Sequence, residues 1–127
     1  MSAPGLAVVL STARLALSVT LILAPPLVLR PWLGADAGRP AFRAVGRGMG
    51  VRDAALALGA LLALRHRGGA RGWLEAAALA DLGDAAATLI AWRHLPRSGR
   101  VTLPLAFAAA VANWRLARQD LGRPTTP

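Results

Sequence analysis

Cysteine, tyrosine and lysine are all absent from this chain of 127 residues. The lack of cysteine excludes disulfides, thiolate metal sites, iron–sulfur clusters and cysteine nucleophiles, and the lack of tyrosine removes the phenol as an acid or base. Acids are scarce as well, because only six face 15 arginines, which leaves a net charge of +9. At this length the chain forms one domain at most.

The distribution of the arginines argues against nucleic acid as a partner. An isoelectric point near 12 normally raises that possibility. Here the arginines fall in groups between hydrophobic runs, as in the loops of a polytopic membrane protein, where cations lie against anionic headgroups. We therefore expect a lipid bilayer as partner and no nucleic acid. The groups are Arg39/Arg43, Arg65/Arg67/Arg71, Arg93/Arg97/Arg100 and Arg115/Arg118/Arg123.

Four hydrophobic runs predict an all-α fold, a four-helix transmembrane bundle with short loops. The chain is 55% hydrophobic with a mean hydropathy of +0.47, which is high for a soluble protein. A hydrocarbon core of about 30 Å needs roughly 20 helical residues. We expect spans at about 5–29, 41–65, 73–92 and 101–118, and location in the cell membrane. Tryptophans near the span ends fit an aromatic belt: Trp32, Trp73, Trp92 and Trp114.

The first run has a competing interpretation as a signal peptide. Pro25-Pro26 is expected to end or kink its helix near Ala24, because a residue before proline avoids the helical region. A small-residue triplet, Ala35-Asp36-Ala37, could then serve as a cleavage site. Against this, nothing basic precedes Arg14 and three more apolar runs follow.

The second run is too short to cross a bilayer by its apolar part alone. Residues 54–64 form only about 16 Å of helix. A spanning helix must also take in the segment that begins at Pro40, which brings Arg47, Arg52 and Asp53 to membrane depth. The alternative is a short buried or interfacial helix with these charges in water.

The third run holds Asp81 and Asp84 near its centre. An ionisable group at bilayer depth costs about 2.5–3.5 kcal/mol, so it needs a partner or a purpose. Counted along the helices, Arg52 and Asp84 both lie about 18–20 Å from the loop at 65–72. Arg14 and Asp81 both lie about 13 Å from the same membrane side. We predict that Arg52 reaches Asp84 or Asp81.

Charged residues at membrane depth balance in sign, so we expect a neutral interior. The other arginines face only Asp36, Glu75 and Asp120, which accounts for the whole net charge. Pairing makes buried ions tolerable, and the planar guanidinium suits a carboxylate. The candidate buried polar cluster comprises Arg14, Arg47, Arg52, Asp53, Asp81 and Asp84.

Glycine and alanine patterns predict close helix packing, not cofactor binding. The Gly46-Arg47-Gly48-Met49-Gly50 string has no preceding strand and lacks the dinucleotide spacing. A small-residue stripe follows it at Ala55, Gly59 and Ala63. His66 and His94 lie in basic loops without neighbouring ligands, so we expect no metal and no cofactor.

One string carries a family resemblance. Gly50-Val51-Arg52-Asp53 opening a span, followed by Gly59 and then by Asp81 and Asp84 in the next span, resembles the small four-span bacterial and fungal membrane proteins grouped as domain of unknown function 4267. The likeness covers roughly 42–117. It implies the same fold and the same polar residues, and it names no chemistry.

The function that these features favour is binding of a small molecule or a proton within the bundle. We expect an aspartate to border a cavity, and Asp81 is the choice because Arg14 lies on a helix that need not adjoin 73–92. Three alternatives stay open: a proton-coupled small transporter, a membrane enzyme acting on a lipophilic substrate, and a structural module, alone or as a homo-oligomer. The sequence assigns no catalytic residue and no ligand.

Overall fold

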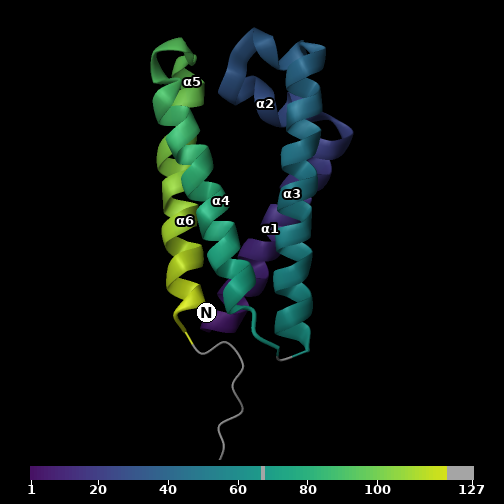
Figure 1. Cartoon of the computed structure of the whole chain (residues 1–127), viewed down its shortest axis with the longest axis vertical. Coiled ribbons are helices and arrows are strands. Elements are labelled where there is room, and N and C mark those ends of the chain that lie inside the picture. The colour runs from purple at the N-terminus through teal and green to yellow at the C-terminus, as the bar shows by residue number, and fades with distance from the viewer. Residues whose placement is uncertain (67, 120–127) are drawn as a thin grey trace, which may run out of the picture.

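All regular structure in the described residues, 1–66 and 68–119, is helical. This computed structural model therefore confirms the all-α class. Three charged residues that the sequence places in loops, Arg67, Asp120 and Arg123, lie outside the described residues. The elements in chain order are α1 (Ala3–Leu23), α2 (Pro25–Leu33), η1 (Gly34–Gly38), α3 (Pro40–Arg65), α4 (Arg71–Ile90), η2 (Trp92–His94), α5 (Arg97–Arg100) and α6 (Thr102–Ala117) (Figure 1).

The first hydrophobic run breaks where its prolines predict. α1 ends at Leu23, Ala24 leaves the helical region with φ −138°, and Pro25 begins α2. The span is thus shorter than the predicted 5–29, because Pro25 cannot donate the hydrogen bond that would continue α1. α1 has 21 residues and is the one helix in the described chain that is long and apolar enough by itself to cross a membrane.

The second run forms one unbroken helix, so the alternative of a short helix is wrong. α3 has 26 residues, about 39 Å in length, with Pro40 in its first turn as predicted. α4 begins two residues before the predicted 73–92. Val101 keeps helical angles between α5 and α6, and the Leu105 amide donates to its carbonyl. Residues 97–117 therefore run almost continuously over about 31 Å.

Two glycines of α3 let it pack closely against α1 and α2. A Cβ on Gly50 would lie 2.9 Å from the Ser18 carbonyl oxygen of α1, and one on Gly46 would lie 2.7 Å from a methyl of Leu29. Gly48, between them in sequence, meets nothing within 4 Å. The packing interpretation of this glycine string is thus confirmed for its two outer glycines.

The stripe predicted further along α3 packs against its neighbours at Gly59 and Ala63 but not at Ala55. Ala55 is exposed, and Gly59 lies directly against the indole ring of Trp73 on α4. The residues of α3 that are buried lie four, seven, eleven and fourteen positions beyond the first, on one helical face. They are Gly46, Gly50, Asp53, Ala57 and Ala60.

The helices form two antiparallel pairs, α1 with α3 and α4 with α6, which converge at one end and diverge at the other (Figure 1). At the convergent end α1 begins, α6 ends and the α3–α4 loop lies. An apolar cluster closes this end: Ala7, Ala60, Ala70, Leu74, Leu116 and Ala117. At the divergent end α2 fills the space between the pairs, and its Trp32 backbone lies directly on Gly99 of α5.

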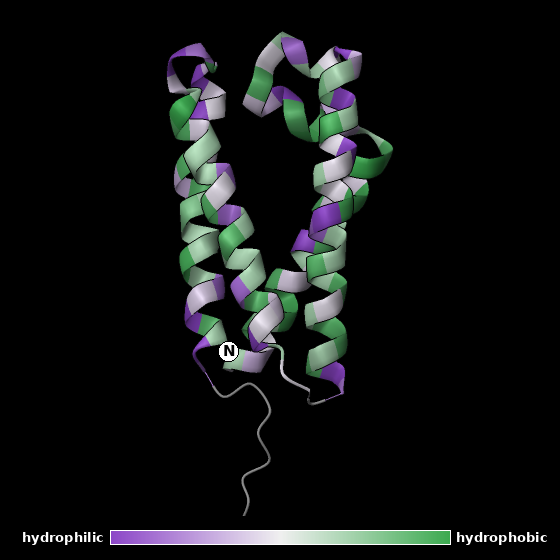
Figure 2. Ribbon diagram, viewed as in Figure 1, coloured by the Kyte–Doolittle hydropathy of each residue, from purple (hydrophilic) through white to green (hydrophobic). Residues whose placement is uncertain are grey.

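The bundle carries most of its large apolar side chains outside its core. Ten of its 15 buried hydrophobic residues are alanine, so the large apolar side chains are mostly elsewhere. They are exposed on all four long helices, along which hydrophobic segments (green) alternate with more polar ones in Figure 2. A soluble helix bundle places polar residues on its outer faces. Exposed examples are Val8, Val9, Val51, Leu58, Leu79, Leu89, Phe107 and Trp114.

The contact at Gly50 generates a prediction with an internal control. Gly50→Ala is expected to push α1 away from α3 and to lower the free energy of unfolding by about 1–3 kcal/mol. Gly48→Ala, two residues away, is expected to be neutral or to stabilise by about 0.5–1 kcal/mol, because alanine favours the helix. Thermal unfolding followed by circular dichroism measures both. Equal effects of the two changes would contradict the close approach of α1 and α3.

Candidate functional site

Five charged side chains form a continuous series of contacts at mid-height in the bundle. The Asp53 Oδ1 atom accepts a hydrogen bond from Arg52 Nε at 3.0 Å and lies 3.4 Å from Arg14 Nη1. Arg14 Nη2 donates to Asp81 Oδ2. Arg52 donates from both terminal nitrogens to the two oxygens of Asp84, at 3.3 and 2.9 Å. We call this series, Asp81–Arg14–Asp53–Arg52–Asp84, the ion chain.

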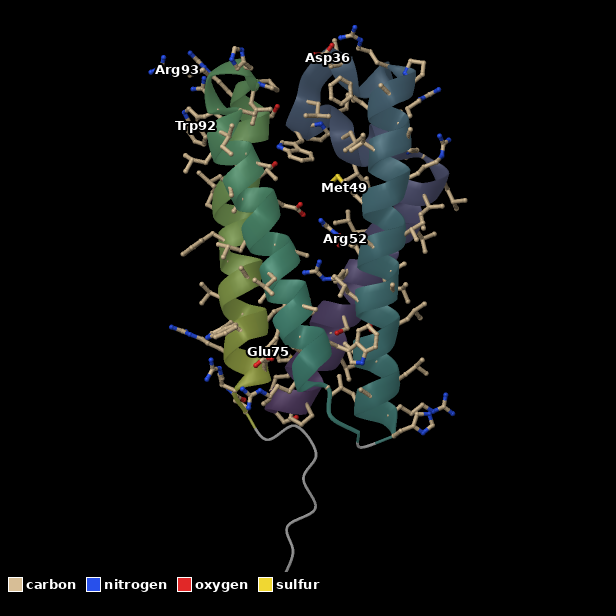
Figure 3. The ribbon with its side chains drawn as sticks, in the orientation of Figure 1. Asp36, Met49, Arg52, Glu75, Trp92 and Arg93 are labelled. Carbon is tan, nitrogen blue, oxygen red and sulfur yellow. The ribbon has the colours of Figure 1, made fainter. Side chains whose placement is uncertain are left out.

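The ion chain joins the two helical pairs. Asp81 and Asp84 are three residues apart and so lie on one face of α4. This face points toward α1 and α3. Arg52 points from α3 toward α4, about one turn from Met49 (Figure 3). The predicted contact of Arg52 with Asp84 is therefore confirmed. Arg14 reaches Asp81 from α1, as their equal depth suggested.

Arg47 does not join the cluster to which the sequence assigned it. It precedes Arg52 by five residues, which turns it about 140° around α3. Its side chain is exposed, and Nε donates to the Ile22 carbonyl in the last turn of α1 at 3.2 Å. The expected neutral interior is wrong for this reason. The ion chain holds two guanidinium groups and three carboxylates, a formal charge of −1.

Asn113 on α6 belongs to the site, and the sequence interpretation missed it. The side chain is buried, and its Nδ2 donates to Asp81 Oδ2 at 3.0 Å and to the Ala109 carbonyl at 3.0 Å. The sequence offered one sign of this role, because Asn113 is the only residue with an amide side chain in the apolar run 101–118. Asp81 is therefore better partnered than expected, but only through Oδ2. Its Oδ1 accepts no hydrogen bond from the described residues.

A partly open cavity of about 380 Å³ lies against the ion chain, between the two helical pairs and beneath α2. Three carboxylates, those of Asp53, Asp81 and Asp84, border it together with the Arg14 guanidinium. The rest of its wall is largely apolar: Leu17, Leu21, Val28, Leu29, Trp32, Met49, Leu105, Ala106 and Ala109, with Thr102. The polar network is therefore not closed on itself but faces open space on one side.

Other polar groups near the site bond locally. The Thr88 hydroxyl, on the aspartate face of α4, donates to the Asp84 carbonyl and not to a carboxylate. Within the described part of the chain, no three His, Cys, Asp or Glu side chains are arranged to hold a metal ion. His66 follows α3 at one end of the bundle and His94 lies in η2 at the other. Neither contributes to the ion chain.

The different places of Arg14 and Arg47 predict different effects of the same substitution. Arg14→Gln leaves Asp53 and Asp81 without their shared cation, so we expect a loss of about 3 kcal/mol in the free energy of unfolding. Arg47→Gln removes an exposed side chain, and we expect a change within about 0.5 kcal/mol. Chemical denaturation of both variants under the same conditions gives the comparison. A loss at Arg47 as large as that at Arg14 would place Arg47 back in the buried cluster.

Comparisons with known proteins were made at the level of families, of single sequences and of structures. A scan against models of protein families, a search of curated proteins and a search of solved structures each find no match to the chain.

Proposed function

We propose that this protein is a four-span membrane protein that binds a small molecule or a proton in the cavity beside the ion chain. The spans are α1, α3, α4 and the continuous α5–α6 segment. The observation that carries the binding proposal is the position of Asp81: its Oδ1 atom, without a hydrogen-bond donor from the described residues, borders an open cavity inside a helical bundle. The likeness to domain of unknown function 4267 stays a proposal and adds no chemistry.

The outer surface supports the membrane part of the proposal. Leucine and valine cover the outside of all four helical elements, whereas the ion chain lies inside, which suits a hydrocarbon solvent. Judged by their sequences alone, α3 and α4 contain more charged residues than an ordinary apolar transmembrane helix. Those near mid-height are paired inside the bundle: Arg52 with Asp53 and Asp84, and Asp81 with Arg14 of α1. Their cost in lipid is thereby reduced.

Tryptophans and arginines at the two ends agree with the same orientation of the bundle in a bilayer. Trp73 and Trp114 lie at the convergent end, and Trp92 lies at the divergent end. The Arg118 guanidinium lies 4.5 Å from the centre of the Trp114 ring, and Arg100 lies 5.3 Å from that of Trp92. Such amphipathic pairs suit the headgroup level of a bilayer.

A proton-coupled transporter is the second candidate, and the division into two helical pairs favours it. Each pair is packed tightly within itself, and at mid-height the pairs are joined by the contacts of Arg14 with Asp81 and of Arg52 with Asp84. One end is closed by an apolar cluster and the other carries the cavity. Rocking of one pair against the other would expose such a site to alternate sides.

The absence of native cysteine makes labelling of single cysteines a direct test. Leu79→Cys lies on the outer face of α4, Ser98→Cys lies at the end of the bundle, and Ala106→Cys lines the cavity. We expect a water-soluble maleimide to label Ser98→Cys in native membranes and to spare Leu79→Cys until the membrane is dissolved. Ala106→Cys is expected to react more slowly than Ser98→Cys but measurably.

The two parts of the proposal fail separately in this experiment. Rapid labelling of Leu79→Cys in intact membranes would overturn the membrane-spanning arrangement. Protection of Ala106→Cys as complete as that of Leu79→Cys would overturn an accessible cavity while leaving the spans in place.

A further inference from the structure

The charge of the cavity wall is unbalanced toward negative. Three carboxylates and one guanidinium border the space, and the second guanidinium, that of Arg52, lies between Asp53 and Asp84 in the same network without lining the cavity. With every group ionised the ion chain carries −1. An unbalanced charge away from bulk water is costly, and the cost falls when a cation takes a place beside it.

The excess charge is concentrated on the α4 side of the cavity. Asp53 is held between two arginines, whereas Asp81 and Asp84, the two ends of the ion chain, each contact one. The Oδ1 atom of Asp81 has two lone pairs, and neither accepts a hydrogen bond from the described residues. A ligand that donates N–H bonds to these two carboxylates would complete the network.

The apolar part of the cavity wall indicates that the rest of the ligand is apolar. Leu17, Leu21, Val28 and Leu105 form an apolar surface, and the indole of Trp32 adds an aromatic one. About 380 Å³ is near the lower end of the range for small-molecule sites. An inorganic cation would leave this apolar wall without a contact, and an anion would add to the excess negative charge.

We propose that the cavity binds a small lipophilic ammonium ion, with its N–H groups on Asp81 and Asp84 and its apolar body against α1, α2 and α6. This deepens the proposed function and rests on it. The apolar body supplies most of the contact area, and the ion pair makes the site selective for a cation. A neutral analogue would leave the negative charge of the site unbalanced.

The test compares three molecules of nearly equal shape that differ in charge. 2-Phenylethylammonium is the cation, propylbenzene is its neutral analogue and 3-phenylpropanoate is the anion. Binding to the full-length protein in a non-ionic detergent is measured at pH 7 by equilibrium dialysis and by the shift in unfolding temperature. We expect at least ten-fold tighter binding of the cation than of the neutral compound, and no shift with the anion.

Two variants locate the effect. Asp81→Asn removes the excess charge, so the preference for the cation is expected to fall at least ten-fold while binding of propylbenzene is kept. Ala106→Leu narrows the cavity at its α6 wall without changing its charge and is expected to weaken both ligands, whether or not Asp81→Asn folds. Asp36→Asn, which alters an exposed carboxylate in η1, serves as the matched control with unchanged binding.

The outcomes separate the inference from the proposed function. Equal binding of the cation and propylbenzene would overturn the charge selectivity and leave a small-molecule cavity intact. Preference for the anion would overturn the assignment of charge. Failure of all three molecules to bind, with Ala106→Cys still accessible to maleimide, would overturn the inference while the accessible cavity stands.

Discussion

Pairing of two guanidinium groups inside the bundle is the constraint on which the rest of this structure depends. Each of the two arginines, Arg14 and Arg52, lies between two carboxylates, and these come from two different helices in both cases. Removing water from an arginine is tolerable only with such partners. The rotation of α1, α3 and α4 about their axes and their relative height are therefore set by the same few contacts. Apolar packing alone would allow several such arrangements, since it is not directional.

Small residues make this polar interior geometrically accessible. An arginine side chain reaches a neighbouring helix only when the two backbones are close, and α1 and α3 approach at Gly50. Large apolar residues would separate the helices, so leucine is left to the outer surface. The apolar outer surface and the ion chain are thus two results of one packing arrangement. The bilayer proposed above would suit that outer surface.

Sequence patterns predicted the helices well because the causes are local. Pro25 ended α1, Pro40 began α3, and the level of Arg52 with Asp84 followed from the rise per residue. The errors concern direction around a helix and longer-range contacts. Depth alone placed Arg47 with Arg52, although five residues turn it to another face.

Two further features of the site depend on which helices are neighbours in the bundle. α6 pairs with α4, which brings Asn113 onto Asp81, and no pattern in either helix states that pairing. The fold of α2 back between the pairs likewise follows from tertiary contacts, at Gly99 and around Leu29, and it is α2 that turns a gap between helices into a lined cavity.

The unequal distribution of the ion chain over the helices has a consequence for biogenesis. Arg52 contacts Asp53 within α3, so that helix carries its own counter-ion before any partner arrives. α4 brings two carboxylates and no basic residue of its own to that depth, and α1 brings an arginine without an acid. In a bilayer, α4 would therefore be the costliest segment to insert alone. Its entry would depend on α1 and α3 already being in place, which makes the order of the segments in the chain also the order of their assembly.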